Sequence, residues 1–189
     1  SSGAKAYGNF VPGSASASTA GLPFQTPMYF DGTTNFVSLP STGLGNFDNG
    51  FSAGVWVCPT NNARATNFFD FGGGRSNDNI RLERDGETNH LLLYVFRGSG
   101  QKSMRAENAI TPNTWQHFSV TITPSGVATI YKNGIQIRQG TSNDWRPRNV
   151  ERSSNYVGYT SWTENRLFQG QMADLGVWNR AISLEEVRS

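Results

Sequence analysis

The stretch WQHFSVTITPSGVATIYKNGIQIRQ, residues 115–139, contains three short apolar and β-branched runs separated by two turn sequences. In the first run Phe118, Val120 and Ile122 alternate with polar residues, which places them on one face of a β-strand. Between the second and third runs, Asn133-Gly134 can supply the two positive φ angles of a type I′ hairpin turn. The stretch therefore predicts consecutive antiparallel strands with one face packed on a core.

The same pattern of short strands and turns continues through the rest of the chain. Further strand patterns occur in MYFDGTTNFVSL, FSAGVWVCP, NFFDFGG, IRLERDGETNHLLLYVF, NYVGY and FQGQMADLGVW. Roughly a dozen strands with turn signals about every 8 to 12 residues are typical of sandwiches and barrels. We therefore predict an all-β, two-sheet antiparallel sandwich. At the C-terminus Ser183 and Glu186 have the spacing of a capping box, which predicts one short helical turn.

Composition agrees with a β fold and narrows the classes of partner. Aromatic residues make up 12% of the chain and favour pleated sheets, whereas only 16% of residues are charged. The net charge is +2, and the arginines are scattered among acidic residues rather than clustered as in a phosphate-binding surface. Nucleic acid is therefore not an expected partner. Membrane insertion is not expected either, because no apolar run reaches the length of a membrane span.

Residues 1–27 differ in composition from the remainder and are rich in Gly, Ser, Ala and Pro. Such a segment can be a flexible linker or an extended arm that lies on the domain or on a neighbouring subunit. Four apolar residues slightly favour the docked arm, because a linker needs no apolar anchors: Phe10, Val11, Leu22 and Phe24. We predict an arm or linker at residues 1–27 and one domain at residues 28–189. The chain begins without Met or a signal-like apolar stretch, so we expect a processed or excised product.

Seven motifs, taken in order, resemble the laminin-G-like, concanavalin A-like jelly-roll superfamily. They are YFDGTTNFVSLP, FSAGVWVCP, NTWQHFSVTI, VATIYKNGIQI, NYVGY, FQGQMADLGVWNRAIS and LEEV. The resemblance extends from about Met28 to Val187, and DLGVWNRAISLEEV is its most specific part. It implies a jelly roll of two curved sheets that is usually non-catalytic and binds extracellular glycans or proteins through edge loops or the concave face.

The resemblance also implies a structural Ca²⁺ that braces loops near the first and last strands. The positions of this chain that match the site are Asp31 in FDG and Asp174 in MADLG. Calcium takes six to eight oxygens, so backbone carbonyls and water would complete the coordination. Two alternatives need no metal. Asp31 can serve as a turn residue beside Gly32, and Asp174 can be a buried carboxylate paired with Arg180.

Three loop sequences carry side chains suited to a sugar, which presents an apolar ring face and a fringe of hydroxyls. Flat aromatic rings match the face, while planar Arg and Asn side chains match the hydroxyls. The candidate ligand-binding residues are Arg75 and Asn77 in FGGGRSND, Trp145 and Arg146 in SNDWRPRN, and Tyr159 and Trp162 in GYTSWTENR. The alternative for the tryptophans is packing, as lids over the ends of the sandwich.

Catalysis is the weakest of three functional hypotheses. Retaining glycosidases of this fold place carboxylates at alternating positions of one strand, and the nearest match is Glu83, Asp85 and Glu87. Asp85-Gly86 is also a turn signal, which would break that alternation. We therefore predict a non-catalytic module that binds a polysaccharide or the glycan of a glycoprotein. The second hypothesis is a surface, capsid-decorating or fibre component in which the arm contacts neighbouring subunits.

Overall fold

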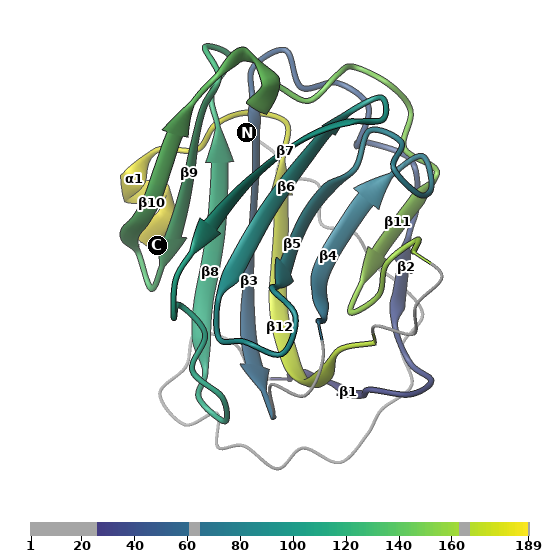
Figure 1. Cartoon of the computed structure of the whole chain (residues 1–189), viewed down its shortest axis with the longest axis vertical. Coiled ribbons are helices and arrows are strands. Elements are labelled where there is room, and N and C mark those ends of the chain that lie inside the picture. Colours follow the sequence, from purple (N-terminus) through teal and green to yellow (C-terminus); the bar gives the residue numbers. More distant parts are fainter. Residues whose placement is uncertain (1–25, 61–64, 163–166, 189) are drawn as a thin grey trace.

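The computed structural model describes residues 26–60, 65–162 and 167–188 and has two six-stranded antiparallel sheets that overlap in Figure 1. One sheet, called the β3 sheet, has the strand order β1-β12-β3-β8-β9-β10. Its strands are β1 (Met28–Asp31), β3 (Phe51–Pro59), β8 (Gln116–Ile122), β9 (Val127–Lys132), β10 (Ile135–Thr141) and β12 (Gln169–Trp178). The predicted all-β, two-sheet antiparallel sandwich is confirmed.

The second sheet, called the β5 sheet, has the order β2-β11-β4-β5-β6-β7. Its strands are β2 (Val37–Leu39), β4 (Asn67–Gly72), β5 (Ile80–Arg84), β6 (Leu91–Arg97), β7 (Gly100–Ala106) and β11 (Ser154–Val157). Strands β10 and β7 are therefore end strands of different sheets, and they lie side by side at one edge of the sandwich (Figure 1).

The stretch from residue 115 to 139 forms three neighbouring strands, as predicted. Phe118, Val120 and Ile122 of β8 are fully buried, and Val120 faces Ile130 in the register of β8 on β9. Asn133 and Gly134 join β9 to β10 with φ angles of 50° and 74°, the two positive values that a type I′ turn requires. The inner faces of the two sheets together form one apolar core.

Two short helices complete the described structure. A 3₁₀ turn, η1 (Asn143–Trp145), lies in the loop after β10, where the sequence showed no helical signal. The predicted C-terminal turn is α1 (Leu184–Arg188), and its capping box is present: Ser183 N donates to Glu186 Oε2 and Glu186 N donates to Ser183 Oγ. No helix of the described residues is long and apolar enough to cross a membrane. The predicted arm lies almost entirely outside the described residues, which begin at Thr26.

Candidate functional site

Trp145, one of the predicted ligand-binding residues, is buried in the core. It ends η1, it is only 2% exposed, and its side chain belongs to the apolar core. The ammonium of Lys102 lies 5.8 Å from the centroid of the indole ring. The buried ring is therefore a lid, the alternative left open by the sequence, and it does not present a flat exposed face to a sugar.

An open groove with a volume of about 560 Å³ lies beside Trp145, between the end strands β7 and β10. We call it the β7–β10 groove. Its lining includes Met104 and Ile137 as apolar surfaces, and Lys102, Arg138, Gly140 and Trp145. Ligand sites in proteins have volumes of roughly 300–1,000 Å³ and combine apolar walls with a few polar groups. The groove therefore has the size and the mixed lining of a ligand site.

The strand registers show which side chains point inward at the groove. In the register of β7 on β6, Lys102 is paired with Val95 and Met104 with Leu93. Val95 and Leu93 are buried in the core, so Lys102 and Met104 lie on the inner face of β7. On β10, a β-bulge between Gln136 and Arg138 shifts the register. After the bulge, Arg138 is paired with Ile130 and Gly140 with Ala128. Ile130 and Ala128 are buried in the core, so Arg138 and Gly140 lie on the inner face of β10.

Gly140 leaves the indole nitrogen of Trp145 accessible from the groove. A Cβ atom at position 140 would lie 3.4 Å from Nε1 of Trp145, and nothing larger than hydrogen occupies that position. Among the described residues, the indole N–H has no hydrogen-bond partner, although the Trp145 side chain is almost completely buried. The nitrogen atom itself is open to the groove, so this N–H is a donor that a bound molecule can use.

Charge around the groove is mainly positive. Arg105, on the outer side of β7, forms an ion pair with Asp85 at 2.6 Å. No ion pair of Lys102 or Arg138 is present within the described residues. Glu107 is the acidic residue of the lining. The groove therefore contains two cations on its inner walls whose charge is not neutralised by a carboxylate in direct contact.

The other residues predicted from the loops near Trp145 lie outside the groove. Arg146 lines a smaller depression of about 280 Å³ together with Arg97 and Arg148. Arg75 is exposed in the loop between β4 and β5. In the same loop Asn77 donates from Nδ2 to the carbonyl of Gly73, so part of its hydrogen-bonding capacity holds the loop itself.

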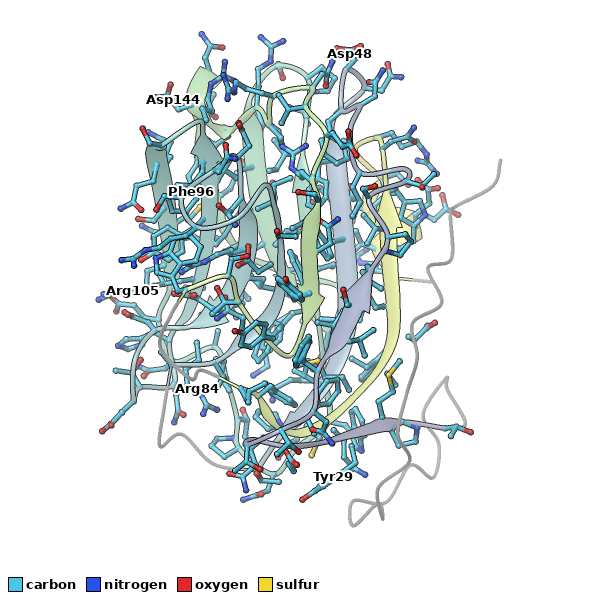
Figure 2. All side chains as sticks on the ribbon, turned by 90° about the vertical axis from the view of Figure 1, so that its right-hand side faces the viewer. Tyr29, Asp48, Arg84, Phe96, Arg105 and Asp144 are labelled. Carbon is cyan, nitrogen blue, oxygen red and sulfur yellow. The ribbon has the colours of Figure 1, made fainter. Side chains whose placement is uncertain are left out.

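Tyr159 and Trp162 lie on the outer face of the β5 sheet. The Trp162 ring centroid is 4.0 Å from Cζ of Arg81, and Arg81 is itself paired with Glu83. Tyr159 stacks on Phe36 with ring centroids 4.6 Å apart. Figure 2 shows this outer flank on the left, where Phe96, the ring beside Trp162, and Arg105 are labelled. The six predicted residues thus occupy separate places and do not form one platform.

Asp31 has the geometry of a turn residue. Its Oδ1 accepts from the backbone N–H groups of Thr33, Thr34 and Asn35 at 2.7, 2.8 and 3.3 Å, and its Oδ2 accepts from the Thr34 hydroxyl. Partial burial opposes ionisation, but these hydrogen bonds outweigh it and hold the pKa of Asp31 well below its ordinary value. The carboxylate is therefore ionised and already occupied by the turn that follows β1.

The register separates Asp31 from Asp174, so the predicted calcium pair is not brought together. Asp31 is paired with Gln169 in the register of β1 on β12, and Gln169 and Asp174 are five positions apart, about 16 Å along the strand. One ion cannot contact both carboxylates at that distance. The alternative for Asp174, a buried carboxylate paired with Arg180, is wrong, because Asp174 is exposed and Arg180 pairs with Glu186. The described residues contain no group of three or more acidic, His or Cys side chains that could hold a metal.

The carboxylates considered for catalysis do not share a face. Glu83 is on β5, is 4% exposed and pairs with Arg81, whereas Asp85 and Glu87 lie beyond the end of the strand in the turn before β6. The alternation required by a retaining glycosidase is thus broken after Arg84, as the turn signal indicated.

Sequence reasoning missed the residues that line the groove. Lys102, Met104, Arg138 and Gly140 have no distinctive motif around them, and they come from strands that are not hydrogen-bonded to each other. One signal was available. Gly140 is an isolated glycine in a β-strand pattern, which can mark a close approach or a bulge.

Comparisons with known proteins agree with the fold. The model of the family described as the concanavalin A-like lectin/glucanases superfamily matches residues 31–188. Curated protein sequences gave no match. Among solved structures, the CBM40 domain of the Ruminococcus gnavus IT-sialidase, bound to α2,3-sialyllactose, is similar with a TM-score of 0.72 and 10% identity, over 87% of this chain and 95% of that one.

Two further structures are similar over most of this chain. Domain 4 of AbnA, a GH43 extracellular arabinanase from Geobacillus stearothermophilus, in complex with arabinotriose, has a TM-score of 0.69 and 21% identity over 97% of this chain and 85% of that one. The binding domain of botulinum neurotoxin serotype G has a TM-score of 0.70 and 14% identity over 97% of this chain and 45% of that one. At these identities the likeness shows a shared fold.

Proposed function

The chain belongs to the concanavalin A-like lectin/glucanase superfamily, and we propose that it is a non-catalytic carbohydrate-binding module that holds part of a glycan in the β7–β10 groove. The observation that carries the proposal is the indole N–H of Trp145, which lies in a buried residue, faces the groove and has no partner among the described residues. A sugar hydroxyl or ring oxygen would supply the missing acceptor.

The lining of the groove suits a saccharide in two further respects. Met104 and Ile137 offer apolar contact to the C–H face of a sugar ring, and Lys102 and Arg138 offer donors to its oxygens. The absence of a side chain at Gly140 gives a ring room to approach the indole edge. Catalysis is not part of the proposal. Glycoside hydrolysis uses a pair of carboxylates, and the groove lining includes a single one, Glu107.

Similar structures support the class of ligand. The R. gnavus CBM40 domain was solved with sialyllactose and the AbnA domain with arabinotriose, so the same sandwich binds sugars in other proteins. The AbnA arabinanase is extracellular, which supports the proposal that this module also works outside the cell, on a secreted or surface polysaccharide or on a glycoprotein glycan. Contacts from the outer loops, through Arg75, Arg146 or Trp162, stay predictions.

The experiment begins with a glycan array on the purified protein, followed by calorimetry with the strongest ligand. Gly140→Val should abolish binding or weaken it at least about tenfold, because its methyl groups fill the space beside Trp145. The position accepts a Cβ at ordinary contact distances from Trp145 and Met104, and a β-branched residue suits a strand. The variant should therefore fold.

Gln136→Val is the matched control. Gln136 lies on the same strand but is paired with Tyr131, so its side chain lies on the outer face of β10, away from the groove. Gln136→Val should bind as wild type does. Full binding by Gly140→Val would exclude the groove, and loss of binding in Trp162→Ala instead would move the site to the outer face of the β5 sheet. No binding to any glycan would contradict the proposed function as a whole.

A further inference from the structure

We propose that the β7–β10 groove selects a negatively charged saccharide unit, with a carboxylate or sulfate group lying between Lys102 and Arg138. This inference rests on the proposed function and adds the chemical class of the ligand. Two inner-face positions of this sandwich depart from the usual apolar pattern. Inner-face positions of packed sheets are normally apolar, yet Lys102 on β7 and Arg138 on β10 both occupy such positions.

The two cations lie on opposite walls of the same groove. Lys102 comes from the end strand of the β5 sheet and Arg138 from the end strand of the β3 sheet. Neither is neutralised by an ion pair within the described residues, whereas the neighbouring Arg105 is paired with Asp85. With Glu107 as the one acidic side chain of the lining, the groove has an excess of positive charge. An anionic group is the complement of this arrangement.

The kinds of donor present fit an oxyanion. The planar guanidinium of Arg138 can donate two parallel hydrogen bonds to a carboxylate or sulfate. The ammonium of Lys102 lies over the Trp145 ring, 5.8 Å from its centroid, a contact that favours keeping the charge at the groove. The unpartnered indole N–H of Trp145 adds a third, neutral donor close to Gly140.

Inward-pointing charges have another known use, which the structure also allows. Cations at the end strands of a sheet discourage pairing with the edges of other molecules, and β7 and β10 are both end strands. Edge protection requires only the charges. It explains neither the open volume of about 560 Å³ nor the indole donor that faces it, and a ligand site explains both.

The test compares three oligosaccharides of the same length: a neutral one, one with uronic acid units and one with sulfate groups. Calorimetry at low and high NaCl should show that at least one anionic oligosaccharide binds about tenfold or more tightly than the neutral one. That advantage should shrink at high salt, because screening weakens charge contacts. Preference for the uronate or for the sulfate ligand identifies which of the two anionic groups the groove accepts.

Arg138→Gln and Lys102→Met should each weaken binding of the anionic ligand about tenfold. They should weaken binding of the neutral ligand by clearly less, because a neutral oxygen loses a hydrogen bond but no charge contact. Arg188→Gln is the matched control, because it removes the same charge at an exposed position of α1 outside the groove and should have no effect. Arg75→Gln is measured beside it, because Arg75 is the charged candidate of the loop between β4 and β5. Sedimentation compares the oligomeric state of each variant with that of the wild type.

Each outcome decides between the ideas. Equal affinity for neutral and anionic ligands, with loss of both in Gly140→Val, would keep the proposed function and overturn the charge selectivity. Arg138→Gln with unchanged anionic affinity but new self-association would assign the cation to edge protection. Loss of anionic affinity in Arg75→Gln alone would place recognition at the loop between β4 and β5. Binding of none of the three ligands would overturn the inference, and the glycan array then decides separately whether the proposed function stands.

Discussion

Arg148 donates two hydrogen bonds to the carboxylate of Asp78, from Nε to Oδ1 at 2.7 Å and from a terminal guanidinium nitrogen to Oδ2 at 2.5 Å. The residues are 70 positions apart and belong to the loop before β5 and the loop after η1. Asp78 also accepts from the backbone N–H of Gly98, between β6 and β7. One buried carboxylate therefore connects three loops at the end of the sandwich where η1 lies.

Asp78→Asn should lower the free energy of unfolding by about 1–3 kcal/mol at pH 7, because it removes a charged acceptor with several partners. The hydrogen bonds from Arg148 hold the pKa of Asp78 below its ordinary value. A lowered folded-state pKa gives stability that is complete above the unfolded pKa, about 4, and is lost as the pH falls through the folded pKa. The difference between wild type and Asp78→Asn should therefore narrow below about pH 4.

Urea unfolding between neutral and acidic pH measures this difference directly. Glu151→Gln makes the same chemical change at an exposed acid and should alter stability by less than about 0.5 kcal/mol. A difference for Asp78→Asn that stays constant down to acidic pH would mean that the ionised carboxylate is not what stabilises these loops.

Asp31→Ala should destabilise the protein by about 1–2 kcal/mol whether calcium is present or chelated, because the carboxylate bonds to the chain itself. Thermal unfolding of wild type and variant, each with EDTA and with excess calcium, separates the turn from the metal. A calcium-dependent rise in the wild-type melting temperature that disappears in Asp31→Ala would restore the calcium proposal at this residue. The same assay on Asp174→Ala tests the other predicted ligand independently.

Trp162 covers a buried ion pair on the outer face of the β5 sheet. Arg81 and Glu83 are 6% and 4% exposed, and the Trp162 ring lies against the guanidinium. Trp162→Ala should cost about 1–3 kcal/mol in unfolding free energy, with a smaller loss for Trp162→Phe, which keeps an aromatic cover. Urea unfolding gives both values. Glycan affinity should be unchanged in Trp162→Phe, and its loss at full stability would support the predicted contact of Trp162 with sugar.

The fold could be predicted from the sequence because its signals are local. Alternation in Phe118, Val120 and Ile122 has the period of a strand, and Asn133-Gly134 has the backbone preference of a hairpin turn. The capping box at Ser183 and Glu186 spans a single helical turn. Each of these features depends on residues a few positions apart, so the chain needs no long-range contact to reveal them.

The site depends on relationships between distant segments and was not predictable in the same way. Simple alternation along Ile135, Gln136, Ile137 and Arg138 would turn the arginine outward, but the bulge in β10 brings it to the inner face. Trp145 has the same polar neighbours in sequence whether it is exposed or a lid. The distance from Asp31 to Asp174 is set by the register of β1 on β12, which motif order does not contain.

Gly158, directly after β11, should be among the positions least tolerant of substitution. Its φ is +75°, a left-handed conformation that costs L-residues roughly 1–2 kcal/mol. A Cβ there would lie 2.6 Å from a ring carbon of Phe30, and that ring is buried edge-on against Phe168. The aromatic ring has no room to withdraw within a close-packed core. Gly158→Ala therefore combines backbone strain with overpacking, for a loss of about 3–5 kcal/mol.

Gly43→Ala separates the two causes, because Gly43 has a similar φ of +89° but no described atom within 4 Å of the added methyl group. It should lose only the strain term of about 1–2 kcal/mol. A double variant, Gly158→Ala with Phe30→Leu, should recover part of the loss if the clash with the ring is the larger cause, since leucine leaves space where the ring edge stood. Equal losses in Gly158→Ala and Gly43→Ala, measured by urea unfolding, would show that strain alone accounts for the glycine at 158.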